Sequence, residues 1–152
     1  MTDPMPEPKS TPETIALRLP SRLELLGLLD RVADSLCERL AFDEDARSQV
    51  TMSVIEAGTN AIQHGHHRDP SKPVDIEFHL LPDALEIVVH DSGAGFDLKS
   101  VNGNVTSPEH LLDARGRGIY IMRACMDTVD FRFDGTGTVC RMIKRRPPAA
   151  AG

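Results

Sequence analysis

Residues 43–65 constrain the fold of this chain more than any other segment. Apolar residues recur along the segment at helical intervals on two sides, which is typical of a helix packed between other elements. One line of polar residues, spaced three and four apart, interrupts this pattern, and it comprises Gln49, Ser53, Glu56, Asn60 and Gln63. Residues at such spacing share one helix face. The segment therefore predicts a mostly buried helix with one narrow polar face, capped at its start by Asp43 and ending at Gly65.

The polar face has two explanations, and the sequence leaves both open. Most stripes of this kind are the solvent-exposed side of a helix. The alternative is a reaction site, because the centre of the stripe holds Glu56 beside Asn60 and no lysine or arginine. A carboxylate can take a proton from an attacking hydroxyl. A carboxamide oxygen is a hard ligand of the kind that Mg²⁺ accepts.

Strand and helix patterns alternate along the rest of the chain. We expect strands over residues 14–19, 74–81, 84–91, 128–133 and 138–143, with further helices over 23–41 and from 116–118 to 126. Ser21 and Glu24 have the spacing of a capping box for the first of these helices. The order of elements predicts an α+β fold, a two-layer sandwich with helices on one face of a mixed, mainly antiparallel sheet.

Proline marks the ends of the folded part. Four prolines in the first dozen residues predict a disordered arm over 1–12, followed by one domain over 13–146 and a disordered tail over 147–152. The length of 152 residues is that of a single domain.

Composition excludes several classes of function. The formal net charge of −6 and the absence of tryptophan disfavour a nucleic-acid partner. No run approaches the roughly 18 apolar residues of a membrane span. The three cysteines are far apart and form no C-x-x-C pair, so we expect neither disulfides nor a zinc site, and a cytoplasmic protein. His64, His66 and His67 are interpreted as a polar loop rather than a metal site.

Two glycine-rich loops could each contact a ligand. Asp91 opens the first, D-S-G-A-G, where glycines allow close backbone approach to a flat ligand and the carboxylate could accept a hydrogen bond from an exocyclic amine such as that of adenine. The second, R-G-R-G at 115–118, precedes a helix whose N-terminal amides and dipole favour an anion. Alone, each is a weak signal, because an ordinary turn or a plain helix entry explains it equally well.

The order of the motifs is far more specific. E-A-G-T-N-A-I-Q-H-G, D-S-G-A-G-F, G-R-G-I-Y-I-M and G-T-G-T follow one another at residues 56–65, 91–96, 116–122 and 135–138. This series resembles the N, G1, G2 and G3 boxes of the GHKL superfamily. Within this superfamily, the chain resembles the anti-sigma-factor serine/threonine kinases in its sequence over residues 56–65 and 118–127 and in its small size. The resemblance extends over about residues 13–145. The resemblance implies the Bergerat fold, with ATP and Mg²⁺ as cofactors.

The resemblance also implies roles for particular residues. Glu56 would be the general base for a serine or threonine hydroxyl, and Asn60 would hold Mg²⁺. Residues 97–115 would form a lid. The residues expected to contact the nucleotide are Asn60, Asp91, Gly93, Gly95, Arg115, Gly116, Arg117, Gly118 and Thr138. Two positions depart from a simple pattern: Gly58 lies inside a helix, where glycine costs about 1 kcal/mol relative to alanine, and Arg117 stands where the group commonly has an apolar residue.

The function implied is that of an ATP-dependent serine/threonine protein kinase acting as an anti-sigma factor in a partner-switching pathway. Its substrate would be an antagonist of the STAS type, its other partner a sigma factor, and a homodimer is compatible with the resemblance. One alternative is a non-catalytic, nucleotide-dependent binding protein that sequesters a sigma factor or another regulator. A second is an ATPase-like domain that controls a phosphatase or a second-messenger enzyme.

Overall fold

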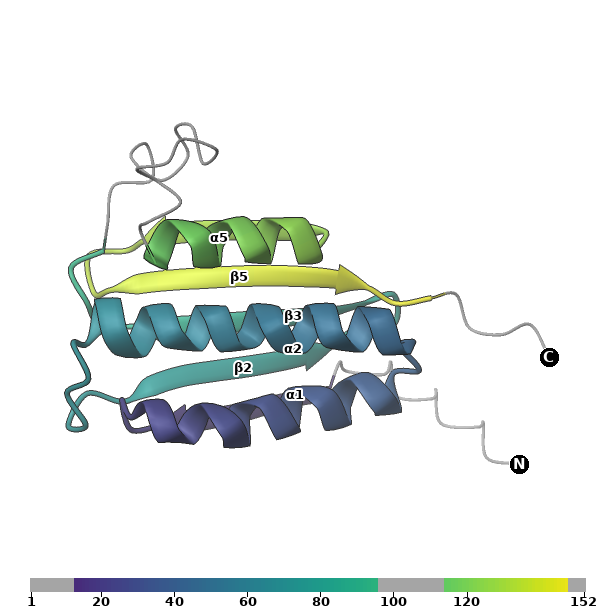
Figure 1. Cartoon of the computed structure of the whole chain (residues 1–152), viewed down its shortest axis with the longest axis horizontal. Helices are drawn as coiled ribbons and strands as arrows, with labels where there is room; N and C mark the ends of the chain where they lie inside the picture. The colour runs from purple at the N-terminus through teal and green to yellow at the C-terminus, as the bar shows by residue number, and fades with distance from the viewer. Residues whose placement is uncertain (1–12, 96–113, 148–152) are drawn as a thin grey trace, which may run out of the picture.

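The computed structural model describes residues 13–95 and 114–147. In this part of the chain, five strands form one sheet and the helices lie together against one of its faces (Figure 1). The strands are β1 (Glu13–Leu19), β2 (Val74–Leu80), β3 (Ala84–Asp91), β4 (Thr128–Phe133) and β5 (Thr138–Arg145). The helices are α1 (Leu26–Arg39), α2 (Glu44–Thr59) and α5 (Ala114–Cys125), with a 3-10 turn, η1 (Leu23–Leu25), before α1 and a π-helical turn, η2 (Asn60–Gly65), after α2.

The sheet has the strand order β1-β2-β3-β5-β4, and every pairing among the described strands is antiparallel. The predicted α+β two-layer architecture is confirmed. The prediction of a mixed sheet is wrong for the described strands, because none of their pairings is parallel. The predicted hairpin β2–β3 turns at Pro82, and β4–β5 turns through residues 134–137. In the second turn the Asp134 carboxylate accepts hydrogen bonds from the backbone N–H and the hydroxyl of Thr136. These local signals were strong enough to give the strand boundaries to within a few residues.

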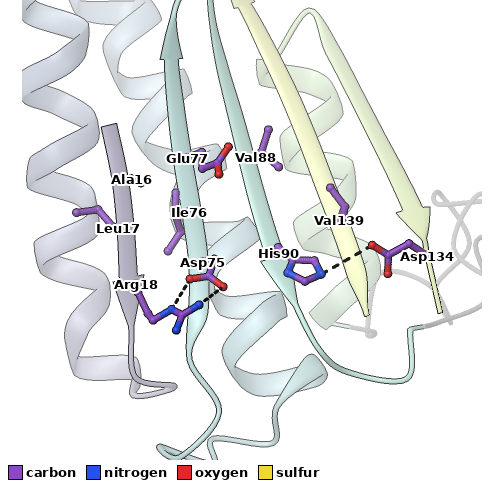
Figure 2. Close-up of a pocket in the computed structure, with 10 residues that line it drawn as sticks. All are labelled: Ala16, Leu17, Arg18, Asp75, Ile76, Glu77, Val88, His90, Asp134 and Val139. Carbon is purple, nitrogen blue, oxygen red and sulfur yellow. Dashed lines mark hydrogen bonds and ion pairs between the residues drawn. The ribbon is translucent and has the colours of Figure 1, made fainter. Parts of the chain in front are cut away.

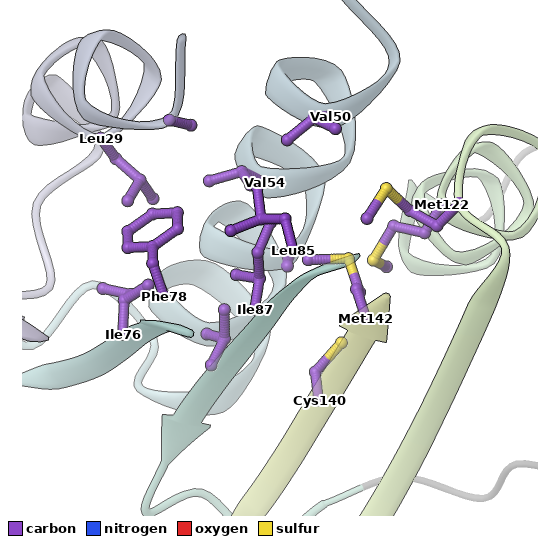
Figure 3. Close-up of a cluster of buried hydrophobic side chains, with 14 of the residues drawn as sticks. Leu29, Val50, Val54, Ile76, Phe78, Leu85, Ile87, Met122, Cys140 and Met142 are labelled. Carbon is purple, nitrogen blue, oxygen red and sulfur yellow. The ribbon is translucent and has the colours of Figure 1, made fainter. Parts of the chain in front are cut away.

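The core lies between the sheet and the helices (Figure 3). Alternate side chains of β2, β3 and β5 point toward α2, since successive side chains of a strand face opposite ways. The core residues that are nearly or fully buried include Leu29, Val50, Val54, Ile76, Phe78, Leu85, Ile87, Met122 and Met142. Burying side chains of this size stabilises each by roughly 1.5–3 kcal/mol. This packing fixes α2 across the middle of the sheet.

The opposite face of the sheet carries charged residues that pair across neighbouring strands (Figure 2). Arg18 donates to both oxygens of Asp75, at 2.8 and 3.3 Å, and Arg141 donates to Glu86 at 2.7 Å. A hollow of about 660 Å³ lies over β1, β2 and β3 on this face, lined by side chains such as Arg18, Glu77 and His90. Alternation of a buried and a polar face is typical of an antiparallel sheet with one solvated side.

The two helix starts behave differently. Asp43 caps α2 as predicted, accepting a hydrogen bond from the Ala46 backbone N–H at 2.8 Å. The capping box predicted at Ser21 is wrong. The Ser21 side chain is buried, its hydroxyl donates to the Lys72 carbonyl at 2.6 Å, and α1 begins after η1 with no side-chain cap. The Ser21 hydroxyl therefore binds a residue distant in sequence, and it does not cap the helix as the local spacing predicted.

The end of α2 also differs from a plain α-helix. The helical path does end at Gly65, but from Asn60 it widens into the π-helical turn η2. Gly65 does not adopt a left-handed conformation; the chain reverses instead through His67 and Arg68, with φ of 50° and 59°. Such π turns are frequent at functional sites. The described part of α5 begins at Ala114, before the predicted start at 116–118, so Gly116 and Gly118 belong to the helix itself.

All three cysteines are free thiols. Burial raises the pKa of Cys37 and of Cys140 to about 12, whereas Cys125 is only partly buried. Within residues 13–95 and 114–147, no helix combines the length and the apolar character required to cross a bilayer. The predicted arm over 1–12, nearly all of the tail and most of the predicted lid lie outside the described residues.

Candidate active site

The polar face of α2 lies beneath α5 and does not form a solvent-exposed stripe. Ser53 is fully buried, and Glu56 and Asn60 are partly buried. Gly118 of α5 is so close that a Cβ there would lie 2.8 Å from Glu56 Oε2 and 3.6 Å from both amide atoms of Asn60. Of the two explanations for the stripe, the solvent face is therefore wrong at its centre. Glycine at position 118 lets the backbone of α5 approach the carboxylate and the carboxamide.

The electrostatics of this centre suit a proton acceptor. Burial raises the pKa of Glu56, and the positive charge of Arg117 opposes the rise. A carboxylate with a raised pKa is a stronger base, and catalytic efficiency improves as that pKa approaches the working pH. Arg117 itself is exposed and lies at the edge of the groove that contains Glu56.

Two buried polar atoms near Glu56 lack partners among the described residues. They are the amide nitrogen of Asn60 and the hydroxyl of Ser53. Leaving such atoms unpaired costs roughly 1–3 kcal/mol each. Because the two amide atoms of an asparagine are assigned from its hydrogen bonds, the carboxamide of Asn60 can present either its oxygen or its nitrogen to a ligand.

The donor set fits magnesium bound together with phosphate. Mg²⁺ prefers hard oxygen ligands and commonly takes only one or two from the protein, the remainder coming from phosphate and water. The Asn60 carboxamide supplies one such oxygen, and the Glu56 carboxylate lies next to it. Among the described residues, no group of three or more histidine, cysteine, aspartate or glutamate side chains could hold a metal ion by itself.

Asp91 ends β3 inside the protein, where only 7% of it is exposed. Burial raises the pKa of its carboxyl, and the hydrogen bond from the Gly93 backbone N–H to Oδ1, at 2.8 Å, opposes the rise. The β3–β5 register places Thr138, which is also buried, directly opposite Asp91. The sequence prediction that these residues lie together is therefore in agreement with the structure.

Glycines enclose the Asp91 turn on several sides. A Cβ on Gly65 would lie 2.7 Å from the Asp91 carboxyl carbon, and a Cβ on Gly137 would overlap the Asp91 carbonyl. Gly93 packs against the Gly65 backbone, and Gly95 has a left-handed φ of 83°. Sequence reasoning placed Gly65 at the end of a helix and Gly137 in a hairpin turn, and it gave neither a role at the site. Their role is steric: they let η2 and β5 close around the Asp91 carboxylate.

A small apolar cavity lies between Asp91 and Asn60. Its walls include Ala57, Val89 and Phe131, which suit the faces of a flat base. The cavity volume is about 20 Å³, room for about one water molecule. A base can therefore enter only if some of the lining side chains move.

The two arginines near the start of α5 face different hollows. Arg115 lines the small cavity and also a polar hollow of about 380 Å³ with His64, His67 and Gly95. Arg117 lines a groove of about 260 Å³ together with Glu56 and Asn60. Gly116 is buried in the first turn of the helix. The predicted phosphate loop is thus brought to the site, with its two positive charges on separate sides.

The three hollows adjoin one another through shared residues. Asn60 lines both the small cavity and the groove of Glu56, Arg115 lines the cavity and the polar hollow, and His64 lines the hollow and the groove. An elongated ligand could therefore extend from an apolar cavity, past a positive charge, to a carboxylate base. The histidines are divided among different environments: His66 is buried, His67 is exposed and His64 lies at the hollow. His66 lies in the loop after η2, as interpreted, but it is buried and hydrogen-bonded and not exposed.

Residues 19–144 match the family model of the histidine kinase-like ATPase domain, and the chain belongs to this family. Its curated relatives include the serine-protein kinase RsbW of Bacillus licheniformis, 31% identical over 136 residues, with 86% of this chain and 85% of the relative covered. RsbW of Bacillus subtilis is 30% identical over 126 residues, covering 80% and 79%. These relatives confirm the predicted superfamily and the predicted serine/threonine kinase group, and membership of an ATPase and kinase family implies the use of ATP.

A solved structure supports the fold independently. The histidine kinase domain of a blue-light activated histidine kinase from Erythrobacter litoralis EL346 superimposes with a TM-score of 0.50 at 17% identity. The match covers 82% of this chain, and this chain spans 60% of that protein. At this level of identity the likeness concerns the arrangement of helices and sheet.

Proposed function

We propose that this chain is a cytoplasmic protein kinase that transfers the γ-phosphoryl group of ATP to a serine or threonine hydroxyl of a partner protein. The observation that carries this function is the position of the partly buried Glu56 against Gly118 and beside Asn60, in a groove that adjoins the base cavity. The cytoplasmic location is proposed because the three cysteines are far apart in the sequence and form no disulfide.

ATP would lie across the three hollows in one orientation. The adenine ring would enter the cavity, where the Asp91 carboxylate can accept a hydrogen bond from the exocyclic amine. The phosphates would lie toward the polar hollow, near Arg115 and the first turn of α5, whose dipole favours negative charge. Gly93, Gly95, Gly116 and Thr138 would allow or line this close approach.

In the transfer step, the acceptor hydroxyl oxygen forms a bond to the γ-phosphorus while the bond to the β-phosphate bridging oxygen breaks and ADP leaves. Glu56 takes the proton of the hydroxyl. Phosphoryl transfer depends mainly on positioning and on stabilising charge, so one base and a few cationic groups can suffice. Arg117 lies beside Glu56 and would stabilise charge at the acceptor side. Asn60 would hold Mg²⁺, which neutralises charge on the phosphates when bound.

The partners are proposed from the resemblance and from the relatives. The substrate would be a STAS-type antagonist, and the chain would also bind a sigma factor and so act as an anti-sigma factor in partner switching. A second copy of the chain is a further expected partner. The groove that holds Glu56 is open to solvent between α2 and α5, which supports an acceptor that belongs to another protein.

The test is phosphorylation of a candidate STAS-type antagonist by wild type and by Glu56→Gln, with Mg-ATP binding measured in parallel. Removing a general base is expected to lower the rate about 10²–10⁴-fold. Glutamine keeps the size of the side chain, so ATP affinity should remain close to that of wild type. Asp45→Asn is a matched control, because it also replaces a carboxylate by a carboxamide, but at the exposed start of the same helix.

Two other outcomes would lead to different functions. Nucleotide binding without phosphorylation of any antagonist by the wild type would favour the non-catalytic binding protein. Full phosphorylation by Glu56→Gln would leave the proposed kinase activity in place but would exclude Glu56 as the general base. Because burial raises the pKa of Glu56, the wild-type rate should also fall as pH is lowered through that raised pKa, as the base becomes protonated.

A further inference from the structure

His66 is an almost completely buried titratable residue that the proposed kinase mechanism does not use. Only 1% of it is exposed, and it lies just beyond η2, where the chain leaves the site. Both ring nitrogens have partners. Nδ1 lies 2.9 Å from the Ser21 hydroxyl, and Nε2 lies 2.8 Å from the Ser92 backbone nitrogen and 2.9 Å from the Ser92 hydroxyl.

The hydrogen bonds define the form of the imidazole. The Ser92 backbone N–H can only donate, so Nε2 must accept and carries a lone pair. In a neutral ring the proton is then on Nδ1, which donates to the Ser21 oxygen. The Ser21 hydroxyl in turn donates to the Lys72 carbonyl at 2.6 Å. A continuous chain of hydrogen bonds therefore joins the segment before β2, the segment before α1, and the turn after β3.

The last link of this chain holds the turn that contains Asp91. The peptide between Asp91 and Ser92 supplies the N–H bound by His66, and the next N–H, that of Gly93, binds the Asp91 carboxylate. Gly65, one residue before His66, packs against the same carboxylate. Two contacts thus fix the position of the Asp91 carboxylate. His66 holds the peptide that follows Asp91, and Gly65 packs against the carboxylate itself.

We propose that His66 is a positioning residue for base recognition: through Nε2 it holds the Asp91–Ser92 peptide so that the Asp91 carboxylate faces the amine of the bound purine. This inference rests on the proposed nucleotide site and assigns to it a determinant of base selectivity. His66 does not touch the nucleotide. Loss of its contact to Ser92 should therefore weaken the discrimination between purines with and without the exocyclic amine.

Two conservative substitutions separate the two ends of the ring. In His66→Gln the carboxamide reaches the position of Nε2 and can still accept from the Ser92 N–H. In His66→Asn the shorter carboxamide occupies the position of Nδ1, so it can donate to Ser21 but does not reach Ser92. Ser92→Ala is a control that removes the hydroxyl and keeps the backbone N–H.

The experiment measures the dissociation constants of Mg-ATP and of the magnesium complex of purine riboside triphosphate, which lacks the amine, by calorimetry. A hydrogen bond to a charged group is expected to give wild type roughly 10- to 100-fold preference for ATP. His66→Gln and Ser92→Ala should keep that preference within about threefold, and His66→Asn should reduce it to about threefold or less. Melting temperatures recorded alongside show whether each variant is folded. Should His66→Asn fail to fold, His66→Met, which fills the volume with only a weak acceptor, replaces it.

Each outcome is decisive. Wild type that binds neither triphosphate would refute the proposed nucleotide site itself. Wild type that prefers ATP, with an equal preference in His66→Asn or in His66→Met, would overturn the role of His66 and leave the nucleotide site in place. A variant that melts earlier but discriminates as wild type does would show that His66 only stabilises the fold.

Discussion

The first and second halves of the helical segment 44–65 are built for different purposes. In the first half, Asp43 caps the helix and Arg47 forms two hydrogen bonds, at 3.0 and 2.9 Å, to Asp34 of α1. Val50 and Val54 are fully buried in the core. The polar groups here have partners, and the apolar side chains fill the space between α1 and the sheet.

In the second half these features are reversed. Asn60, together with Ser53 at the boundary between the two halves, buries a polar atom without a partner among the described residues, and burial raises the pKa of Glu56. The α-helical hydrogen-bond pattern changes to a π turn at Asn60. A segment under selection for stability alone would replace such groups with alanine or leucine. The difference supports the proposal that the second half retains groups whose partners arrive with a ligand, at a cost in stability that the first half and the core offset.

The largest test of this comparison is Asn60→Ala. At about 100 times its dissociation constant, Mg-ATP should stabilise wild type by roughly 2.7 kcal/mol, on the order of 5–15 °C in melting temperature. The variant should lose most of that shift. Without nucleotide it should melt no earlier than wild type, because a buried amide without a partner has been removed. Melting curves with and without Mg-ATP measure both quantities, and an undiminished shift would exclude Asn60 as a ligand of the magnesium nucleotide.

Gly118→Ala should lower the rate of phosphoryl transfer by about 10–100-fold, because a displacement of about 1 Å in a reacting group can cost this much. The added Cβ would lie 2.8 Å from Glu56 Oε2, so the carboxylate must move. The substitution also improves helix propensity, so the free protein should be no less stable. Initial rates and melting temperatures, measured for the variant and wild type, show whether the rate falls without a loss of stability. A variant with the wild-type rate would place the working position of Glu56 away from α5.

Asp43→Ala tests the half that serves stability. Loss of the cap should lower the free energy of unfolding by about 1 kcal/mol, measured by urea denaturation. The Mg-ATP dissociation constant should not change, since Asp43 lies at the other end of the helix from Asn60. A change in affinity of more than about threefold would mean that the two halves are coupled, contrary to the comparison.

Ser53→Ala should have the smallest effect. Removing a buried hydroxyl that has no partner is expected to leave the free energy of unfolding within about 1 kcal/mol of wild type, in the stabilising direction. Urea denaturation with and without Mg-ATP shows whether the hydroxyl acquires a partner in the complex. A clear loss of stability in the free protein would reveal a partner for Ser53 and would move the boundary between the two halves toward Glu56.

The elements and motifs were predictable because their signals are local. The hairpin strands follow from alternation, the cap at Asp43 from its position before acidic residues, and the order of the glycine motifs gave the family. The glycine at position 58, costly in a helix, is explained by packing. A Cβ there would lie 2.8 and 3.0 Å from the leucine methyls of residues 26 and 29, so glycine allows these side chains of the preceding segment to pack closely on α2.

The features of the site that could not be predicted depend on contacts between residues that are distant in sequence. Ser21 has the spacing of a capping box, but its hydroxyl joins His66 and Lys72, more than 40 residues away. His66 stands between two other histidines in a polar stretch, and nothing in that pattern distinguishes the one that is buried. The orientation of the polar stripe of α2 was equally undetermined, because periodicity gives a face and not its neighbour. That neighbour is Gly118, and only the packing of α5 brings it there.

The thiols offer a practical route to observing this site at work. Cys37 and Cys140, with pKa values of about 12, remain protonated at ordinary pH and resist alkylation, because the thiolate is the reactive form. Cys125, partly exposed at the end of α5, is the cysteine that a maleimide dye can reach. The wild-type sequence can therefore be labelled with a single fluorophore at Cys125, on the helix that packs against Glu56. Its emission would report movement of that helix during turnover, with no need to engineer a cysteine-free background.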